Sequence, residues 1–252
     1  MKKIKLSICT ASLFMLMSCV DLNLNPLSEG SSENWYSSQA EIEMSLNDFY
    51  RTDFFPIDDM TWGDDVTARN TTSAVNNGTL TSEDGTIAKR WENYYKGIAR
   101  ALRIIKNMDR ARTMGVSEKD IAQYEGEAYF YLGYAYGMLA FHWGDAILDK
   151  EGMSLEEAYT ASRSPKADVL AYSYECLDKA AERLPNSYSG IQRATKGAAY
   201  AFKARIAIYN EDYATAAVAA KNCMDLNVYK LHANYRDLFT ASWSDEWIFF
   251  FR

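Results

Sequence analysis

Apolar residues recur every three or four positions through most of the chain, and this spacing is typical of amphipathic α-helices. Ser37 or Ser38 suits the N-cap of the first helix, and Ser117 with Asp120 three residues later resembles a capping box. The pattern predicts helices at about 39–50, 87–112, 118–141, 154–161, 165–184, 191–209 and 212–226.

Three stretches lack this helical spacing. Val20 to Trp35 has little periodicity, so we expect an extended arm there. Thr52 to Asp84 is polar and rich in Asp, Thr and Asn, which predicts a long loop of the kind that is usually functional or disordered. Trp247 to Phe251 is an apolar run with strand-like character. The chain as a whole is predicted to be mainly α-helical with long irregular loops.

Two pairs of the predicted helices share one spacing of aromatic and small residues. Tyr129-x-x-Leu132-Gly133-x-x-Tyr136 fits the first half of the tetratricopeptide pattern, with an aromatic residue in place of Trp. Tyr200-x-x-Lys203-Ala204-x-x-Ala207 repeats that spacing. The following helices continue the pattern less closely, with Ser173, Leu177, Ala180 and Pro185, and with Ala216, Ala220 and Cys223. We predict tetratricopeptide-like helix pairs; a plain helical bundle is the alternative.

The start of the chain has the pattern of a secretory signal. Lys2, Lys3 and Lys5 come first, and an apolar stretch from Ile4 to Met17 contains no acidic residue. This stretch is shorter than the roughly 20 apolar residues that a membrane-spanning helix needs. We therefore predict a cleaved signal peptide rather than a transmembrane helix.

The apolar stretch ends at Ser18-Cys19, and a small residue before a cysteine resembles the cleavage site of bacterial lipoproteins. Cys19 would then carry acyl chains such as palmitate, which tether a protein to a membrane surface. An ordinary signal peptide with an incidental cysteine is the alternative. The predicted organisation is a signal peptide over 1–18, an arm over 19–38 and a helical repeat domain over 39–252.

Charge and cysteine usage narrow the class of protein. The net charge is −7, and without the three lysines of the signal it becomes −10, from 24 basic and 34 acidic residues. An acidic surface without a basic patch repels phosphate backbones, so nucleic acid is not expected as a partner.

Cys176 and Cys223 lie among apolar helical positions, and we expect buried free thiols there. A disulfide between them is the alternative.

The sequence gives little support for catalysis. Asp58-Asp59 and Asp64-Asp65 supply carboxylates, but adjacent acids in a polar loop are usually solvated or cap turns. His142 and His232 are the only histidines, with no Cys or acid at metal-ligand spacing. Neither a nucleophile elbow nor a Gly-rich phosphate loop is present. We predict no enzymatic activity, no metal and no cofactor.

The loop from Thr52 to Asp84 contains the residue types that bind sugars. Aromatic rings stack on the C–H faces of a sugar, while amides, carboxylates and guanidinium groups bond its hydroxyls. The predicted ligand-binding residues are Trp62, Asp64, Asp65, Arg69 and Asn70. The alternative is that Trp62 and Phe55 only attach the loop to the helices. Trp91, Tyr94 and Tyr95 share one helix face and are expected in the core.

Ordered motifs extend over nearly the whole chain after the signal. They include Cys19-x-Asp21-Leu22-x-x-x-Pro26, Gly63-Asp64-Asp65-Val66-Thr67, Trp91-x-x-Tyr94-Tyr95-x-Gly97-Ile98, Gly126-Glu127-Ala128-Tyr129-Phe130, Arg193-Ala194-Thr195-Lys196-Gly197, Ala201-Phe202-Lys203-Ala204-Arg205 and Glu246-Trp247-Ile248-Phe249. Together they resemble the SusD/RagB family of outer-membrane nutrient-binding lipoproteins.

This resemblance implies a superhelix of tetratricopeptide helix pairs, tethered by lipid at the outer face of the outer membrane. It implies an oligosaccharide or polysaccharide ligand and, as partner, a TonB-dependent SusC-like β-barrel to which the ligand is delivered. A scaffold lipoprotein of the cell envelope that binds no nutrient is the alternative. Family members are longer than 252 residues, so we expect a fragment or a truncated reading frame that carries the helical repeats.

Overall fold

The computed structural model describes residues 35–36, 38–56, 62–63, 66, 73–188, 193–240 and 244–250. The chain divides into two units, Met1–Trp35 and Tyr36–Arg252, and all the helices below belong to the second. The predicted signal peptide and Cys19 lie outside the described residues. In the part of the chain that is described, no helix combines the length and the apolar character needed to cross a membrane.

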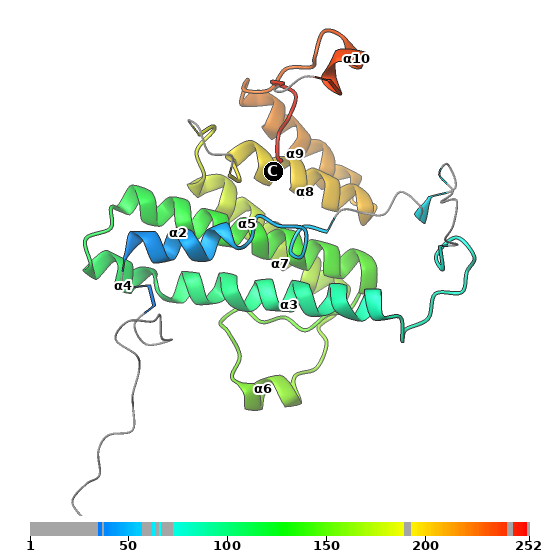
Figure 1. Ribbon diagram of the computed structural model, residues 1–252, viewed down its shortest axis with the longest axis horizontal. Helices are drawn as coiled ribbons and strands as arrows, with labels where there is room; N and C mark the ends of the chain where they lie inside the picture. The colour runs from blue at the N-terminus through cyan, green and yellow to red at the C-terminus, as the bar shows by residue number, and fades with distance from the viewer. Residues whose placement is uncertain are drawn as a thin grey trace, which may run out of the picture. The chain divides into compact units, whose positions relative to one another are not determined.

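The second unit is built from helices, and its described residues form no β-strand, which confirms the predicted mainly α-helical fold (Figure 1). Ala146 and Ser164 exchange two backbone hydrogen bonds in an isolated antiparallel bridge. The helices are α2 (Gln39–Asn47), α3 (Gly85–Lys106), α4 (Met108–Thr113), α5 (Glu118–Trp143), α6 (Leu155–Thr160), α7 (Lys166–Arg183), α8 (Lys196–Tyr209), α9 (Tyr213–Asp225) and α10 (Tyr235–Leu238).

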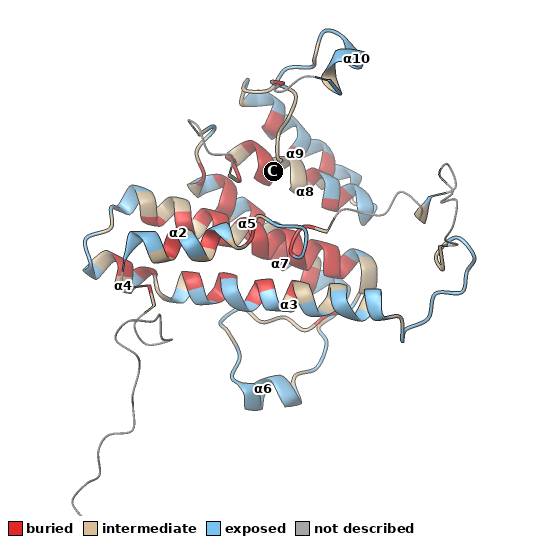
Figure 2. Cartoon of the chain, in the orientation of Figure 1, coloured by how far each residue is buried: buried red, intermediate tan, exposed pale blue. Residues whose placement is uncertain are grey.

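Helix α5 forms the centre of this unit and is buried along most of its length (Figure 2). It contacts α2, α3, α4, α7 and α8, so apolar residues occupy all of its faces. Gly133 allows α7 to come close, because a side chain at this position would collide with Leu177. Ser173 Oγ donates a hydrogen bond of 2.6 Å to the Gly133 carbonyl oxygen. The first predicted helix pair is thus confirmed.

Helices α8 and α9 form the second predicted pair. Their contact buries small residues, among them Ala207, Ala216 and Ala219. The Cys223 thiol lies 3.5 Å from the Gly197 carbonyl oxygen, which again places a small residue where two helices meet. Cys223 is a buried free thiol, as is Cys176 on α7, in agreement with the expectation from the sequence.

The predicted helix starts are confirmed at two serines. The Ser38 hydroxyl accepts a hydrogen bond from the Glu41 amide at 3.3 Å, and the Glu41 carboxylate accepts one from the Ser38 amide at 3.1 Å. This reciprocal arrangement is a capping box at the start of α2. At α5, the Ser117 hydroxyl accepts a hydrogen bond from the Asp120 amide at 3.2 Å.

Three predicted helices differ in their bounds from the observed ones, the first because α2 ends at Asn47 rather than at residue 50. The helix expected over 87–112 is divided at Asn107, whose side chain donates to the Arg103 carbonyl oxygen at 2.7 Å. The apolar spacing continues past this break, since Met108 and Ala111 are both buried, and therefore does not reveal it. The helix expected from 191 begins only at Lys196, after Thr195 as N-cap.

The strand expected at Trp247 to Phe251 is not formed by its described residues, 247–250. Phe249 instead joins a cluster of aromatic rings, with centroids 5.3 Å from Phe55, 5.2 Å from Phe130 and 5.4 Å from Phe202. Ring packing on α5 and α8 thus replaces the backbone ladder that the apolar run suggested.

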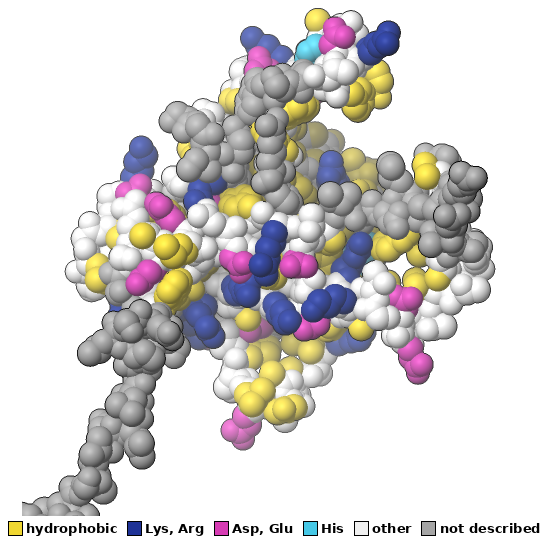
Figure 3. Space-filling view, in the orientation of Figure 1, with side chains coloured by type: hydrophobic (Ala, Val, Ile, Leu, Met, Phe, Trp, Pro, Cys, Tyr) yellow, Lys and Arg dark blue, Asp and Glu magenta, His cyan; other side chains and the backbone are white. Residues whose placement is uncertain are grey.

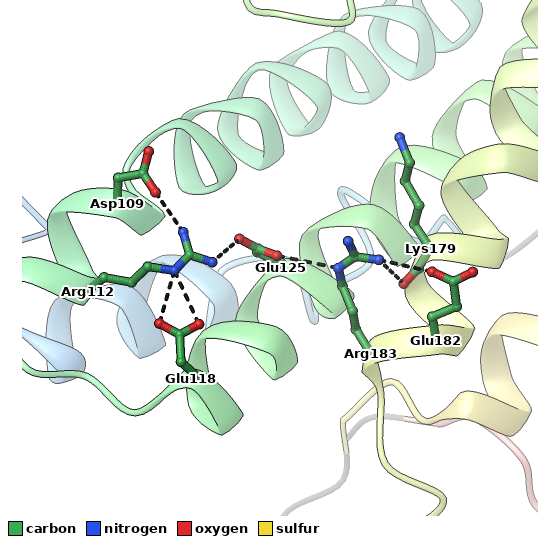
Figure 4. A network of polar contacts seen from close by, with 7 residues as sticks. All are labelled: Asp109, Arg112, Glu118, Glu125, Lys179, Glu182 and Arg183. Atoms are coloured by element: carbon green, nitrogen blue, oxygen red, sulfur yellow. Dashed lines mark hydrogen bonds and ion pairs between the residues drawn. The ribbon is translucent and has the colours of Figure 1, made fainter.

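A polar network joins α4, α5 and α7 on the surface (Figure 4). Glu125 of α5 accepts from Arg112 of α4 at 3.0 Å and from Arg183 of α7 at 3.4 Å. Arg112 also contacts Asp109 and Glu118. Networks of this kind fix the relative position of helices more than isolated exposed pairs do.

Candidate ligand-binding hollow

A hollow of about 670 Å³ lies beside the N-terminal half of α3, and we call it the tryptophan hollow. Three half-buried tryptophans from separate parts of the chain line it: Trp62 from the loop before α3, Trp91 from α3 and Trp143 from the end of α5. The other lining residues are Val75, Leu80, Thr81, Ser82, Ile87, Ala88, Arg90, His142 and Arg163.

The helical spacing of α3 gives the hollow one wall. Asp84 caps the helix by accepting hydrogen bonds from the amides of Thr86 at 2.8 Å and Ile87 at 3.3 Å. Ile87 and Trp91 stand four residues apart, so their side chains share a helix face. The Trp91 ring lies edge-to-face against Trp143, with centroids 5.3 Å apart and an interplanar angle of 72°.

The segment after α5 brings Arg163 to this wall. Gly144, with a φ of 75°, ends α5 and redirects the chain. The Tyr95 hydroxyl then holds this segment to α3 by bonds to the Ile147 amide at 2.8 Å and carbonyl oxygen at 3.0 Å. The bridge between Ala146 and Ser164 fixes the backbone beside Arg163. The Arg163 guanidinium lies 5.1 Å from the centre of the Trp91 ring.

The loop before α3 closes the hollow on another side. The Asn76 side chain donates a hydrogen bond of 2.8 Å to the Gly63 carbonyl oxygen and so ties the Trp62 segment to residues 73–80. The Arg90 guanidinium lies over the Trp62 ring, 4.6 Å from the centre of that ring. The hollow is therefore bordered by two arginine–tryptophan pairs, which come from different elements of the fold.

This arrangement offers a binding surface. Half-buried indole rings present flat apolar faces, and guanidinium groups and the hydroxyls of Thr81 and Ser82 supply hydrogen-bond donors. Among the described residues that line the hollow there is no carboxyl group. In the described parts of the chain, no group of three or more His, Cys, Asp or Glu residues could hold a metal ion.

The structure describes only one of the predicted ligand-binding residues. Trp62 lines the hollow, whereas Asp64, Asp65, Arg69 and Asn70 lie outside the described residues. Phe55 is buried in the core, with its ring centroid 4.7 Å from that of Tyr134, so it attaches the loop to α5 as the alternative expected.

Residues that the sequence did not single out form most of the wall. Trp91 was expected in the core together with Tyr94 and Tyr95; Tyr94 is buried and Tyr95 is half-buried, but Trp91 faces the hollow. Trp143 and Arg163 are far from Trp91 along the chain, and no local pattern connects them with it. Their proximity follows from the end of α5 and the Ala146–Ser164 bridge.

A second hollow, of about 530 Å³, lies between α8 and residues 246–250. It is lined by Phe202, Trp247, Phe249 and Phe250 together with Arg205 and Glu246. The rings of Phe202 and Phe249 belong to the aromatic cluster of the core, with centroids 5.4 Å apart.

Comparison with known proteins identifies related sequences and structures. Residues 30–208 match a family model described as SusD-like, starch-binding and associating with the outer membrane. The SusD-like protein P2 of Formosa agariphila is 25% identical over 265 residues, which cover 96% of this chain and 50% of that protein.

Solved structures share the fold. A SusD-like protein from Bacteroides fragilis superposes with a TM-score of 0.70 at 23% identity, covering 87% of this chain and 45% of the other. A SusD-like carbohydrate-binding protein from the same organism gives a TM-score of 0.66 at 21% identity, covering 81% and 44%. The chain therefore spans about half the length of the relatives it matches.

Proposed function

The chain belongs to the SusD-like family, and from this premise we propose that it binds nutrient oligosaccharides in the tryptophan hollow. The family assignment agrees with the resemblance found in the sequence motifs. Oligosaccharide capture is supported by the family description, which names starch binding, and by the carbohydrate-binding relative from B. fragilis.

Three half-buried tryptophans line one hollow, and the proposed binding of sugars rests on this observation. A sugar ring has an apolar face of C–H groups, which stacks on an indole, and a rim of hydroxyls, which needs hydrogen-bonding groups at the sides. The hollow supplies both, and its volume of about 670 Å³ lies within the range of ordinary ligand sites.

We further propose that Asp64, Asp65, Arg69 and Asn70 complete the site. They belong to the same loop as Trp62, which lines the hollow, and as residues 75–82, which continue its wall. Carboxylates and an amide from this loop would accept the hydroxyl protons of a sugar.

Delivery and anchoring form the second part of the proposal. Lipid attached at Cys19 would hold the protein at the outer membrane, facing the cell exterior, and a SusC-like TonB-dependent barrel would receive the ligand. The lipoprotein-like signal and the family's association with the outer membrane support this assignment. Binding without chemical conversion of the sugar is the proposed role.

The binding site is tested by calorimetry of the full-length protein against a panel of oligosaccharides. Replacing Trp62 and Arg69 by Ala should abolish or strongly weaken glycan binding, since the C–H face of a sugar ring loses its stacking surface with the indole. Tyr159→Ala is the matched control, because this aromatic side chain is 82% exposed on α6, outside the hollow. Unchanged affinity in the Trp62 and Arg69 variant would contradict the site.

The partner is tested by copurification from outer membranes. Recovery of a TonB-dependent barrel would support delivery to a transporter. Recovery of periplasmic proteins alone, together with no binding across the oligosaccharide panel, would favour the scaffold alternative.

A further inference from the structure

We propose that α6, the exposed helix between α5 and α7, is the surface through which the protein docks on the SusC-like barrel. The proposal rests on the delivery step of the proposed function and adds the part of this chain that contacts the transporter. It starts from two apolar side chains of α6, Leu155 and Tyr159, which are 73% and 82% exposed. The partner surface that fits them is an apolar pocket with basic groups around it.

Helix α6 adds nothing to the core of the fold. None of its residues is buried, and the whole helix is exposed (Figure 2). It lies on a loop that leaves the other helices after α5 and returns to them before α7 (Figure 1). A helix this short is not stable alone in water, and most helices owe their stability to tertiary packing. Because no residue of α6 is buried, its order depends on contacts within its own loop.

Local hydrogen bonds hold α6 at both ends. The Ser154 hydroxyl accepts from the Glu157 amide at 3.3 Å, and the Glu157 carboxylate accepts from the Ser154 amide at 2.7 Å, which makes a capping box. At the other end, the Thr160 hydroxyl donates to the Glu157 carbonyl oxygen at 3.1 Å. Leu155 and Tyr159 stand four residues apart, so this short helix presents them on one face.

The loop that carries α6 is fixed where it joins the other helices. The Tyr136 hydroxyl of α5 bonds to the Asp149 amide at 2.9 Å and to the Asp149 carbonyl oxygen at 2.8 Å. The Asp149 carboxylate accepts a bond of 2.9 Å from the Met153 amide, and the Lys150 ammonium lies 4.8 Å from the centre of the Tyr172 ring of α7. Side chains that are held in place before binding lose less conformational entropy when a partner docks.

The exposed pair has the chemistry of a protein-binding surface. Single exposed apolar residues are ordinary, but here two share one face of a helix that is held in place. Tyrosine is common at the centre of protein interfaces, because its ring buries a large area while its hydroxyl finds a hydrogen-bond partner. Within the described residues the Tyr159 hydroxyl forms no hydrogen bond, so it is available to such a partner. On the face seen in Figure 3, apolar side chains gather over α6.

The charges beside this pair favour a basic protein surface over a lipid surface. Glu151 lies in the loop before α6 and Glu156 lies next to Leu155; both are exposed, and in the described parts of the chain neither forms an ion pair. Exposed acids elsewhere are paired, as Glu175 is with Lys179 at 2.6 Å. Unpaired carboxylates attract Lys and Arg of a partner and are repelled by anionic lipid head groups.

The position of α6 relates this surface to the tryptophan hollow. The loop that carries α6 begins after Trp143 and ends at Arg163, and both of these residues line the hollow. A barrel docked on α6 would therefore lie beside the segment that borders the hollow, as the transfer of a bound ligand requires.

The test measures the affinity of the full-length protein for the TonB-dependent barrel that copurifies with it, by biolayer interferometry in detergent. Leu155→Ser/Tyr159→Ser should weaken binding by at least about tenfold, as expected when central apolar residues of an interface are removed. Leu231→Ser/Tyr235→Ser is the matched control, because it changes the same two residue types at the same separation. These side chains are 87% and 77% exposed near α10, and their replacement should leave the affinity unchanged.

The carboxylates are tested separately. Glu151→Gln/Glu156→Gln should slow association with the barrel and reduce the dependence of the association rate on salt, because charges at the edge of an interface act mainly on the encounter. Every α6 variant should keep the wild-type glycan affinity and unfolding temperature, since α6 lies outside the hollow and none of its residues is buried.

The outcomes separate this inference from the proposed function. Equal affinity of the wild type and Leu155→Ser/Tyr159→Ser for the barrel would overturn the inference and leave delivery intact. Weaker binding of Leu231→Ser/Tyr235→Ser alone would place the barrel near α10. If no barrel copurifies with the wild type, the inference fails together with the delivery step, whereas calorimetry still reports on glycan binding in the hollow.

Two other occupants of the α6 surface are distinguished by further measurements. A second copy is detected as self-association in light scattering. A membrane is detected as binding of Cys19→Ser, which lacks the predicted site of lipid attachment, to vesicles of phosphatidylethanolamine and lipopolysaccharide. Either signal, if it is lost in Leu155→Ser/Tyr159→Ser while the affinity for the barrel is unchanged, would contradict docking of the barrel on α6.

Discussion

Glu127 on α5 and Arg193 before α8 form a buried ion pair, with Arg193 Nη1 2.9 Å from Glu127 Oε2. The same carboxylate oxygen accepts a hydrogen bond of 2.7 Å from the Tyr50 hydroxyl, which in turn accepts one of 3.0 Å from the Ala194 amide. The pair therefore connects α5 with the segment after α2 and the segment before α8, which are far apart in the chain.

Removing the cation of this pair should destabilise the fold strongly. In Arg193→Met the Glu127 carboxylate stays buried, at 1% side-chain exposure, without its positive partner. Breaking a buried pair from one side costs about 3–5 kcal/mol, so we expect a loss of this size in urea unfolding. Arg205→Met, at an exposed position, should change the stability by no more than about 0.5 kcal/mol. Similar stabilities for the two variants would show that the ion pair contributes nothing to the free energy of unfolding.

The pH dependence of stability should report on the same carboxyl group. Burial raises the pKa of Glu127 above its usual value, outweighing the lowering by Arg193, Tyr50 and Gln123. A carboxyl group with a higher pKa in the folded state binds more protons there than in the unfolded state. Its contribution to stability is therefore complete below the unfolded-state pKa and is lost as the pH rises through the folded-state pKa.

The direction of this pH dependence is tested by comparing the wild type with Glu127→Gln, whose side chain does not titrate. We expect the free energy of unfolding of the wild type, minus that of the variant, to fall as the pH rises from about 4 to about 7. Urea unfolding at a series of pH values gives both quantities. A difference that grows over this interval would mean that Arg193 lowers the pKa of Glu127 more than burial raises it.

Gly133→Ala tests the close contact of α5 and α7. An added methyl group would stand 2.5 Å from Leu177 Cγ and 3.0 Å from the Ser173 carbonyl oxygen, so the two helices would have to separate. Overpacking of this kind typically costs about 1–3 kcal/mol. Gly85→Ala is the control, since nothing lies within 4 Å of the added atom and the position begins α3. In thermal unfolding we expect Gly85→Ala to be as stable as the wild type or slightly more stable. Equal losses of stability in both variants would contradict the close contact of α5 and α7.

Much of the fold could be predicted because its determinants are local. The caps at Ser38 and Ser117 act on amides three residues away, and the small residues of the two repeats stand at fixed helical spacings. The late start of α8 has a different origin. Arg193 and Ala194 are held by Glu127 and Tyr50, which are distant in sequence, so periodicity alone extends the helix too far.

The candidate site was predictable only in part for the same reason. Trp62 could be selected because its loop combines aromatic rings with the amide, carboxylate and guanidinium groups that bind sugars. Trp143 and Arg163 reach Trp91 only through the turn at Gly144 and the bridge between Ala146 and Ser164, and neither leaves a signal in the sequence near Trp91. Trp91 itself has the spacing of a core residue, and its exposure depends on what packs beside it.

The thiols of α7 and α9 should be unreactive in the folded protein. Burial raises the pKa of Cys176 to about 12 and also raises that of Cys223, so almost no thiolate is present at neutral pH. Both side chains are also largely inaccessible, at 0% and 7% exposure. We expect no labelling of either residue by a maleimide before unfolding and labelling of both in urea without a reductant. Peptide mass analysis distinguishes them from the other cysteines. Failure to label both in urea would indicate a disulfide, and labelling of Cys176 in the native state would contradict its burial between α5 and α7.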